Sequence, residues 1–468
     1  MQEGYVPERL PALGAQEAYW HLNRFAPGAL SSTISIGVTL AGPLDRDALA
    51  WALDEVARCQ PALRTTFEET VGGPVQAIHS ELHLPLRHVR CTGTAAERRV
   101  QATQAEREDR AAPFDLATGP LMRATLIECA RDEHVLVLVA QHAAVDAPGL
   151  DLVVEQLLAC YEARLAGRSS PLHNLTDAYR AEVLAQSESL DDDTLRRCTE
   201  YWRRCATAAR PLIEIPDAAF DGQSRHHEAG CLALRSDLDA FARLHETTPF
   251  AVAAATLRTL LASYTGASSF FIMTPSTRRG TAASQRLAGM FTGLLLLLAR
   301  TDPDATFAEL LGREHATLRE ALAHDKLQLE LLPALAPEFD DSWWSDLRRH
   351  IYEVMSVGLW YRDVRRTAPA PSGLRVDLTM QGSAESPFFY MLAYRKDDGL
   401  HLALDHSTVF FDERRAARLC DDFVTLLNAA MERPHVPVRE LAPQLAGAPP
   451  WRDLARDAGE GRPATADR

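Results

Sequence analysis

Two kinds of hydrophobic pattern alternate along this chain: short runs of branched apolar residues, and longer segments whose apolar residues recur every three or four positions. The first pattern is typical of strands, and the second is typical of helices that bury one face. The order strand, helix, strands, helix, strand, strand, helix occurs roughly twice, without a sequence repeat of fixed period. The pattern predicts an α/β fold with mixed sheets, in which an architecture is repeated.

The predicted elements fall into two lobes and a tail. In the first lobe we expect helices at 15–22, 46–56 and 95–110, strands at 33–40, 63–67, 73–78, 121–128 and 135–140, and a helix beyond 147. In the second we expect helical sequence at 174–209 and 249–264, strands at 230–234, 269–274, 374–380, 388–394 and 401–405, and a last helix at 412–431. The predicted domains are 1–172, 173–443 and a flexible tail at 444–468.

The stretch from 135 to 158 organises the first lobe. Its uninterrupted apolar run, VLVLVA, suits a central strand with both faces covered. Towards residue 158 the apolar residues recur at helical spacing, as in a helix that buries one face. Between the two lie Gln141, His142, Asp146, Pro148 and Gly149, so a buried strand delivers a histidine into a tight turn before a helix N-terminus. Loops held on rigid elements are where chemistry usually occurs.

His142 is therefore the candidate catalytic residue, although a lone histidine at a strand end is more often simply packed in the fold. A metal site at this position is not expected. His142 and Asp146 would need helical spacing to share a face, and no third ligand lies nearby in the sequence.

Composition narrows the class of protein. The 468 residues are 46% apolar and 24% charged, which is typical of a globular protein with an ample core. The net charge of −15 argues against a nucleic-acid partner. The N-terminus has no secretory leader pattern and no apolar run is long enough for a membrane span, so we expect a cytoplasmic protein. Eight scattered cysteines without a C-x-x-C pair indicate reduced thiols.

Six separate stretches carry a family resemblance. They are Ala15-Gln16 with Trp20 and Leu22; Leu63-Arg64-Thr65 with Phe67 and Pro74-Val75-Gln76; Pro113-Phe114-Asp115-Leu116 with Gly119-Pro120-Leu121; Gln141-His142 with Asp146-Ala147; Tyr201-Trp202 with Ile215-Pro216-Asp217; and Thr274-Pro275 with Arg279, Gly289 and Phe291. In this order, over about residues 10–440, the chain resembles the condensation domains of nonribosomal peptide synthetases, within the chloramphenicol-acetyltransferase-like superfamily.

The resemblance implies two acetyltransferase-like lobes in a V, with an active-site tunnel between them. It implies that His142 faces the tunnel, that Asp146 is structural and paired with Arg279, and that position 141 supports the local fold. The chain departs from the family's His-His-x-x-x-Asp-Gly signature at Gln141 and Ala147. Glutamine still offers a donor and an acceptor. Alanine would be unfavourable at position 147 if positive φ is required there, and Gly149 could absorb the difference.

The implied activity joins a carrier-bound aminoacyl or acyl thioester to an amine or alcohol, forming an amide or ester in antibiotic and other natural-product biosynthesis. The enzyme must position two reactants and manage one proton, for which a neutral His142 is suited. Backbone N–H groups of Ala147 and Gly149 are candidate oxyanion donors. We expect no cofactor of its own, a substrate on the phosphopantetheine arm of a carrier protein met in trans, and a free-standing monomer.

Two alternatives stay open at this point. One is an acyltransferase that uses acyl-coenzyme A, although the late Asp-Phe-Gly-Trp-Gly signature of such members is absent from the stretch 406–412. The other is a non-catalytic condensation-like domain that recruits a tailoring enzyme to a carrier protein. Gln141 and Ala147 favour this second alternative, whereas the joint presence of His142, Asp146 and Arg279 favours catalysis.

Overall fold

The computed structural model describes residues 6–25, 32–208, 212, 224–234, 236–327, 357–363, 373–380, 389–396 and 398–441. The chain forms two compact units. Unit 1 comprises 1–194, 277–293 and 366–383, and unit 2 comprises 195–276, 294–365 and 384–468. Each unit is thus assembled from three separate segments of the chain. The predicted domains, by contrast, are each one continuous range of residues.

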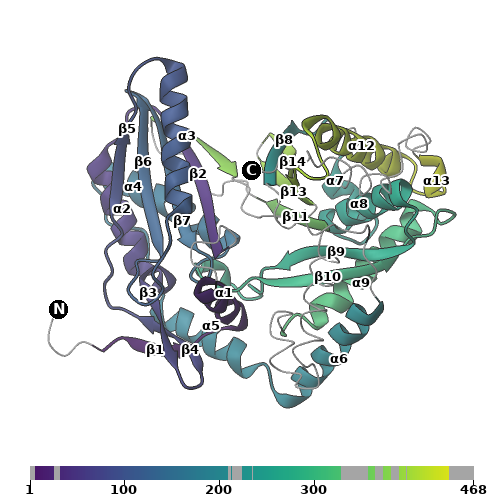
Figure 1. Cartoon of the computed structure of the whole chain (residues 1–468), viewed down its shortest axis with the longest axis horizontal. Coiled ribbons are helices and arrows are strands. Elements are labelled where there is room, and N and C mark those ends of the chain that lie inside the picture. Colours follow the sequence, from purple (N-terminus) through teal and green to yellow (C-terminus); the bar gives the residue numbers. More distant parts are fainter. Residues whose placement is uncertain are drawn as a thin grey trace, which may run out of the picture. The chain divides into compact units, whose positions relative to one another are not determined.

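Unit 1 is built on a five-stranded sheet with β7 (Glu133–Gln141) at its centre (Figure 1). The strand order is β12 (Arg375–Met380), β2 (Thr33–Ala41), β7, β6 (Met122–Ala130), β5 (Leu86–Arg90). Neighbours are antiparallel except β5 and β6, which are parallel. The side chains from Leu136 to Ala140 are fully buried. This confirms the prediction of a central strand covered on both faces.

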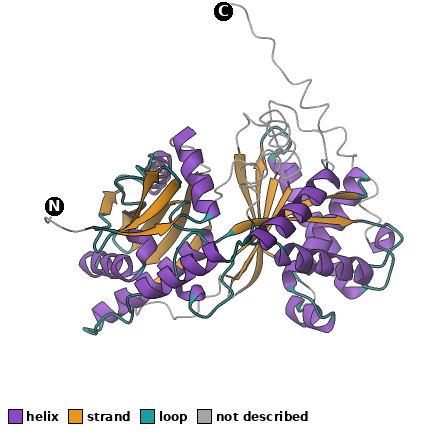
Figure 2. Ribbon diagram, turned by 90° about the horizontal axis from the view of Figure 1, so that it is seen from below, coloured by secondary structure: helices purple, strands orange, loops and turns teal. Residues whose placement is uncertain are grey.

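Helices and a small second sheet complete unit 1. The helices are α1 (Gly14–Phe25), α2 (Arg46–Cys59), α3 (Ala95–Ala111), α4 (Ala147–Leu165) and α5 (Thr176–Glu188), with 3-10 turns at Pro61–Arg64 and Ser284–Arg286. The small sheet has the order β1 (Glu8–Pro11), β4 (Gly73–Ile78), β3 (Thr65–Thr70). Asp45 is the N-cap of α2, because its carboxylate accepts the Ala48 N–H at 2.9 Å. Apolar faces of α2 and α4 share one core with the five-stranded sheet. Figure 2 shows helices lying against strands in this way.

Unit 2 contains a six-stranded sheet. Its order is β10 (Gly293–Arg300), β9 (Ser269–Ser276), β11 (Val357–Asp363), β13 (Phe389–Lys396), β14 (Gly399–Ser407), β8 (Ser224–Cys231). The helices are α6 (Asp192–Ala208), α7 (Leu238–Leu244), α8 (Pro249–Thr265), α9 (Phe307–Ala323), α12 (Glu413–Glu432) and α13 (Val438–Leu441). The helix α8 is capped at its C-terminus by Gly266, which takes φ +70°.

Several predicted elements are corrected by the structure. The helical stretch 174–209 is two helices, α5 and α6, and the strand predicted at 230–234 is the end of β8, which begins at Ser224. The strands β10 and β11 and the helix α9 were not predicted. The strand β12 pairs with β2 and so belongs to unit 1. Such pairing is set by contacts across more than 300 residues of chain, which local periodicity does not record.

The predicted tail at 444–468 lies outside the described residues, and so does Ile215-Pro216-Asp217 of the family resemblance. Among the helices that the structure describes, none is both long and apolar enough to cross a bilayer.

Candidate active site

The turn between β7 and α4 carries the predicted site. Asp146 is the N-cap of α4, and its Oδ1 accepts the Gly149 N–H at 2.8 Å. A Cβ added at Gly149 would lie 3.0 Å from Asp146 Oδ1 and 3.1 Å from the Gly289 nitrogen. A side chain at 149 would therefore be crowded by the turn itself and by a second segment, whose Gly289 carbonyl accepts the Asp146 N–H at 3.1 Å.

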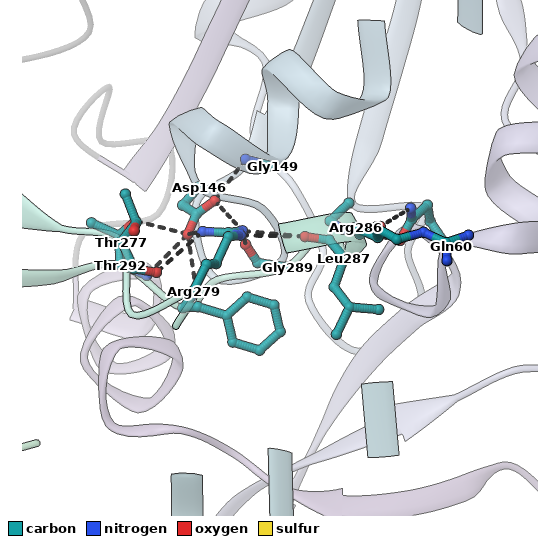
Figure 3. Close-up of polar contacts among 11 residues, drawn as sticks. Gln60, Asp146, Gly149, Thr277, Arg279, Arg286, Leu287, Gly289 and Thr292 are labelled. Atoms are coloured by element: carbon teal, nitrogen blue, oxygen red, sulfur yellow. Dashed lines mark hydrogen bonds and ion pairs between the residues drawn. The ribbon is translucent and has the colours of Figure 1, made fainter. Parts of the chain in front are cut away.

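Asp146 and Arg279 form a buried, two-pronged ion pair (Figure 3). Nη2 of Arg279 donates to Oδ1 at 2.7 Å, and Nη1 donates to Oδ2 at 2.8 Å. Oδ2 also accepts the backbone N–H groups of Phe291 and Thr292 and the Thr292 hydroxyl, at 3.0, 2.9 and 2.8 Å. The carboxylate thus ties the segment 277–293 to the start of α4, within unit 1.

These contacts also set the ionisation of Asp146. Burial alone would raise the pKa of the carboxyl, but the charge of Arg279 and the hydrogen bonds from Arg279, Thr292 and Gly149 outweigh it and lower the pKa. Since every oxygen is already engaged, this carboxylate is suited to bracing the turn rather than to exchanging protons with a substrate.

Gln60, which the sequence did not single out, holds the same segment from the other side. Its side-chain oxygen accepts the Ala288 N–H at 2.9 Å, and its nitrogen donates to the Arg286 carbonyl at 2.9 Å (Figure 3). The side chain is fully buried at the end of α2. A glutamine next to Pro61 is the only trace of this role in the sequence, because the two backbone groups that it holds lie more than 220 residues away.

His142 follows β7 directly and is half-buried. Its backbone N–H donates to the Ser32 carbonyl at 2.8 Å, and its ring stacks on Tyr19 of α1, with centroids 4.4 Å apart and an interplanar angle of 10°. The Nδ1 atom is buried and has no hydrogen-bond partner among the described residues.

Burial lowers the pKa of His142, and the charge of Asp146 and the residue's own backbone oppose that shift without reversing it. The imidazole is accordingly neutral near pH 7, the form that can accept a proton. Desolvation of the ring is the largest of these effects.

Gln141 lies fully buried under the turn. Its side-chain oxygen accepts the Ala143 N–H at 2.6 Å, while its Nε2 has no partner among the described residues. The contact agrees with a supporting role for position 141. A histidine nitrogen could accept the same N–H.

We therefore expect Gln141→His to retain stability, and Gln141→Ala to lose about 1–3 kcal/mol because the buried Ala143 N–H is left unsatisfied. Denaturant unfolding of the two variants, followed by near-ultraviolet circular dichroism, measures the difference. Equal stability of Gln141→Ala and the wild type would show that the Ala143 contact does not support the turn.

A second layer of buried polar groups lies beneath this turn. Gln16 of α1 donates to the Ala143 carbonyl and to the Gln76 side chain, both at 3.2 Å. Tyr179 of α5 donates its hydroxyl to the same Gln76 oxygen at 2.6 Å. Burial raises the pKa of Tyr179, so its hydroxyl stays protonated and donates. This network gives a physical reason for the Ala15-Gln16 stretch noted in the sequence.

The next feature is the pair of predicted oxyanion donors, the backbone N–H groups of Ala147 and Gly149. The Gly149 N–H already donates to Asp146, so the prediction that it stabilises an oxyanion does not hold. Pro148, which precedes it, has no N–H to offer. Ala147 begins α4 and is not among the residues with positive φ, so alanine is unstrained at this position.

Comparisons with known proteins agree with this arrangement. Residues 6–444 match the family model of the condensation domain. The chain belongs to the condensation-domain family. Members of this family form amide bonds in nonribosomal peptide and antibiotic biosynthesis, acting on substrates carried on phosphopantetheine arms.

Its curated relatives are much longer proteins. The condensation domain is 30% identical over 455 residues to one of the linear gramicidin synthase proteins of Brevibacillus parabrevis, covering 96% of this chain and 9% of that synthase protein. It is 26% identical over 464 residues to phosphinothricin tripeptide synthetase PhsB of Streptomyces viridochromogenes, covering 95% of this chain and 38% of that protein. The chain thus spans about a tenth to two fifths of these relatives.

Solved structures show the same fold. The first condensation domain of the calcium-dependent antibiotic synthetase, in complex with a substrate analogue, superposes with a TM-score of 0.76 at 19% identity, covering 93% of this chain and 99% of that one. The X-domain from teicoplanin biosynthesis, in a complex with OxyB, superposes with a TM-score of 0.73 at 24% identity, covering 93% and 96%. The acetyltransferase-like class of fold is thereby confirmed.

Proposed function

We propose that this condensation domain joins an acyl or aminoacyl group on a carrier protein to an amine or alcohol, with His142 as the residue that handles the proton. The observation that supports this most strongly is the state of the His142 ring. It stacks on Tyr19, its Nδ1 is buried, and burial lowers its pKa so that the ring is neutral near pH 7. A positioned neutral imidazole is the usual general base in proteins.

The proposed reaction needs only one base, and every bond and proton in it is accounted for. The acceptor nitrogen or oxygen attacks the thioester carbonyl carbon and forms the new C–N or C–O bond. As the tetrahedral intermediate collapses, the C–S bond breaks and the phosphopantetheine thiolate leaves. The proton of the acceptor passes to Nε2 of His142 and then to the thiolate, so the histidine returns to its neutral form.

The pH dependence offers a first test. Because the pKa of His142 lies below the ordinary value of about 6.5, the single-turnover rate should stay level through that pH and fall only at lower pH. Tyr19→Ala removes the ring that covers one face of the imidazole. The variant should therefore lose activity at a higher pH than the wild type. If the rates of the wild type and Tyr19→Ala fall at the same acidic pH, His142 is not the base.

The identity of the donor is tested separately. We expect turnover with an acyl group on a carrier protein or a pantetheine mimic, and slow turnover with the same acyl group on coenzyme A. Initial rates measured with the two donors at equal concentration decide the matter. Equal or faster turnover with coenzyme A thioesters over several acyl chains would favour an acyl-coenzyme A acyltransferase.

The alternative function is docking without catalysis. One solved neighbour is an X-domain in complex with OxyB. The present chain has Gln141 in place of the first signature histidine. A domain of this kind would bind a loaded carrier and a tailoring enzyme but form no bond. The intact placement of His142 beside the Asp146–Arg279 pair favours catalysis.

A further inference from the structure

A group of metal-ligating side chains lies in unit 2, at the turn between β13 and β14. It consists of Cys231, Asp398 and His401, which offer a thiol, a carboxylate and an imidazole whose ligand atoms all lie within 4.8 Å of one another. Among the described residues it is the one group of three or more histidine, cysteine or acidic side chains that comes this close. Its members are separated by up to 170 residues, so no spacing pattern in the sequence reveals it.

The backbone brings the three side chains together. Cys231, at the end of the edge strand β8, is paired in register with His401 of β14. Directly opposed residues of an antiparallel pair project from the same face, with Cβ atoms about 4.5–5.5 Å apart. The intervening Gly399 has a φ of +140°, and a Cβ there would lie only 2.9 Å from the Cys231 sulfur. Glycine at 399 thus leaves room for the sulfur.

The donor atoms already face one another. The His401 imidazole stacks on Tyr394, with centroids 5.7 Å apart, and its Nε2 lies 2.7 Å from Oδ1 of Asp398. The thiol of Cys231 contacts the Asp398 carbonyl oxygen at 3.5 Å. Asp398 and Cys231 are exposed, so an ion can enter from solvent.

We propose that Cys231, Asp398 and His401 bind a divalent zinc ion, with water in the fourth position. Sulfur, nitrogen and carboxylate donors in a tetrahedral set are the ligands that Zn²⁺ prefers, and a soft thiolate disfavours Mg²⁺ and Ca²⁺. Binding replaces the hydrogen bond between His401 and Asp398 with two bonds to the metal. It also releases the thiol proton of Cys231, so affinity rises with pH.

The bound ion would cross-link the edge strand β8 to the turn between β13 and β14. A ligand that binds only the folded chain raises its stability by mass action. Zinc is therefore expected to raise the melting temperature of the wild-type chain in proportion to the logarithm of the free zinc concentration. The effect should disappear in a chain that lacks the thiol.

The test uses Co²⁺ as a spectroscopic substitute for zinc on the full-length chain, first stripped with a chelator and kept reduced. One equivalent of Co²⁺ should produce thiolate-to-cobalt absorption in the near ultraviolet and the strong visible bands of tetrahedral cobalt, and Zn²⁺ should displace them. Cys231→Ala should abolish the thiolate band, and Asp398→Ala should weaken binding by about 10-fold or more. Both residues are exposed, so these variants are expected to fold.

Cys129→Ala, which removes a half-buried cysteine of unit 1, is the matched control and should bind cobalt like the wild type. No cobalt spectrum in the wild type, or an unchanged thiolate band in Cys231→Ala, would overturn the proposal. A melting temperature that zinc raises equally in the wild type and in Cys231→Ala would overturn the stabilising role.

Discussion

Replacing Asp146 by alanine is expected to destabilise unit 1 by about 3–5 kcal/mol, because Arg279 is then left as a buried charge without its partner. The N–H groups of Gly149, Phe291 and Thr292 lose their acceptor at the same time. For a unit of this size the melting temperature should fall by roughly 6–20 °C. Differential scanning calorimetry or circular dichroism measures this change.

The matched control is Asp45→Ala. Asp45 caps α2 through the Ala48 N–H, as Asp146 caps α4, and it has no arginine partner among the hydrogen bonds and ion pairs that the structure describes. Loss of an N-cap alone costs about 0.5–2 kcal/mol. If Asp146→Ala proves no more destabilising than Asp45→Ala, the ion pair with Arg279 does not brace the turn. A stable but inactive Asp146→Ala would make the aspartate a functional residue instead.

The same carboxylate gives the expected pH dependence of stability. Since the pKa of Asp146 is lower in the folded chain than in the unfolded chain, its contribution is present above the unfolded value and is lost as the pH falls through the folded value. The stability difference between the wild type and Asp146→Ala should therefore narrow on acidification. A difference that does not change with pH would show that the side chain acts without its charge.

Replacing His142 by alanine is expected to slow bond formation by about 10²–10⁴-fold while the fold is retained, because proton transfer by one positioned group is worth that much. The ring is half-buried and packs on Tyr19, so its loss affects stability far less than the loss of Asp146. An alcohol acceptor should suffer more than an amine, since it needs a base to become nucleophilic.

His134→Ala is the matched control for this prediction. His134 is a buried histidine at the opposite end of the same strand, β7. Its removal should lower stability but leave the rate of bond formation in the folded protein nearly unchanged. A similar loss of rate in both variants would indicate that damage to the strand, rather than loss of the base, accounts for the effect.

The sequence predicted the centre of this site well and its supports poorly. The strand β7, the turn and the helix α4 follow from a continuous apolar run and the stripe after it, both local patterns. The partnership of Asp146 and Arg279 came from the family resemblance, since 133 residues separate them. Periodicity alone gives no reason to pair them.

The supports depend on contacts that no local pattern encodes. In the sequence Gln60 is an ordinary polar residue at a helix end, and its role follows only from its contacts with the segment 277–293. In the sequence Tyr19 is one residue of an amphipathic helix, and nothing there predicts that its ring stacks on His142. The same is true of β12, which joins the first sheet from beyond residue 370. Each is fixed by tertiary packing, which overrides local preference.

The most direct test of the central claim is a single-turnover assay with an acyl group loaded on a carrier protein and a panel of amines and alcohols. The account predicts that the wild type forms product with at least one acceptor, and that His142→Ala forms it about 10²–10⁴-fold more slowly. If the wild type binds the loaded carrier but forms no product with any acceptor, or if His142→Ala keeps the wild-type rate, His142 is not the catalytic residue of this domain.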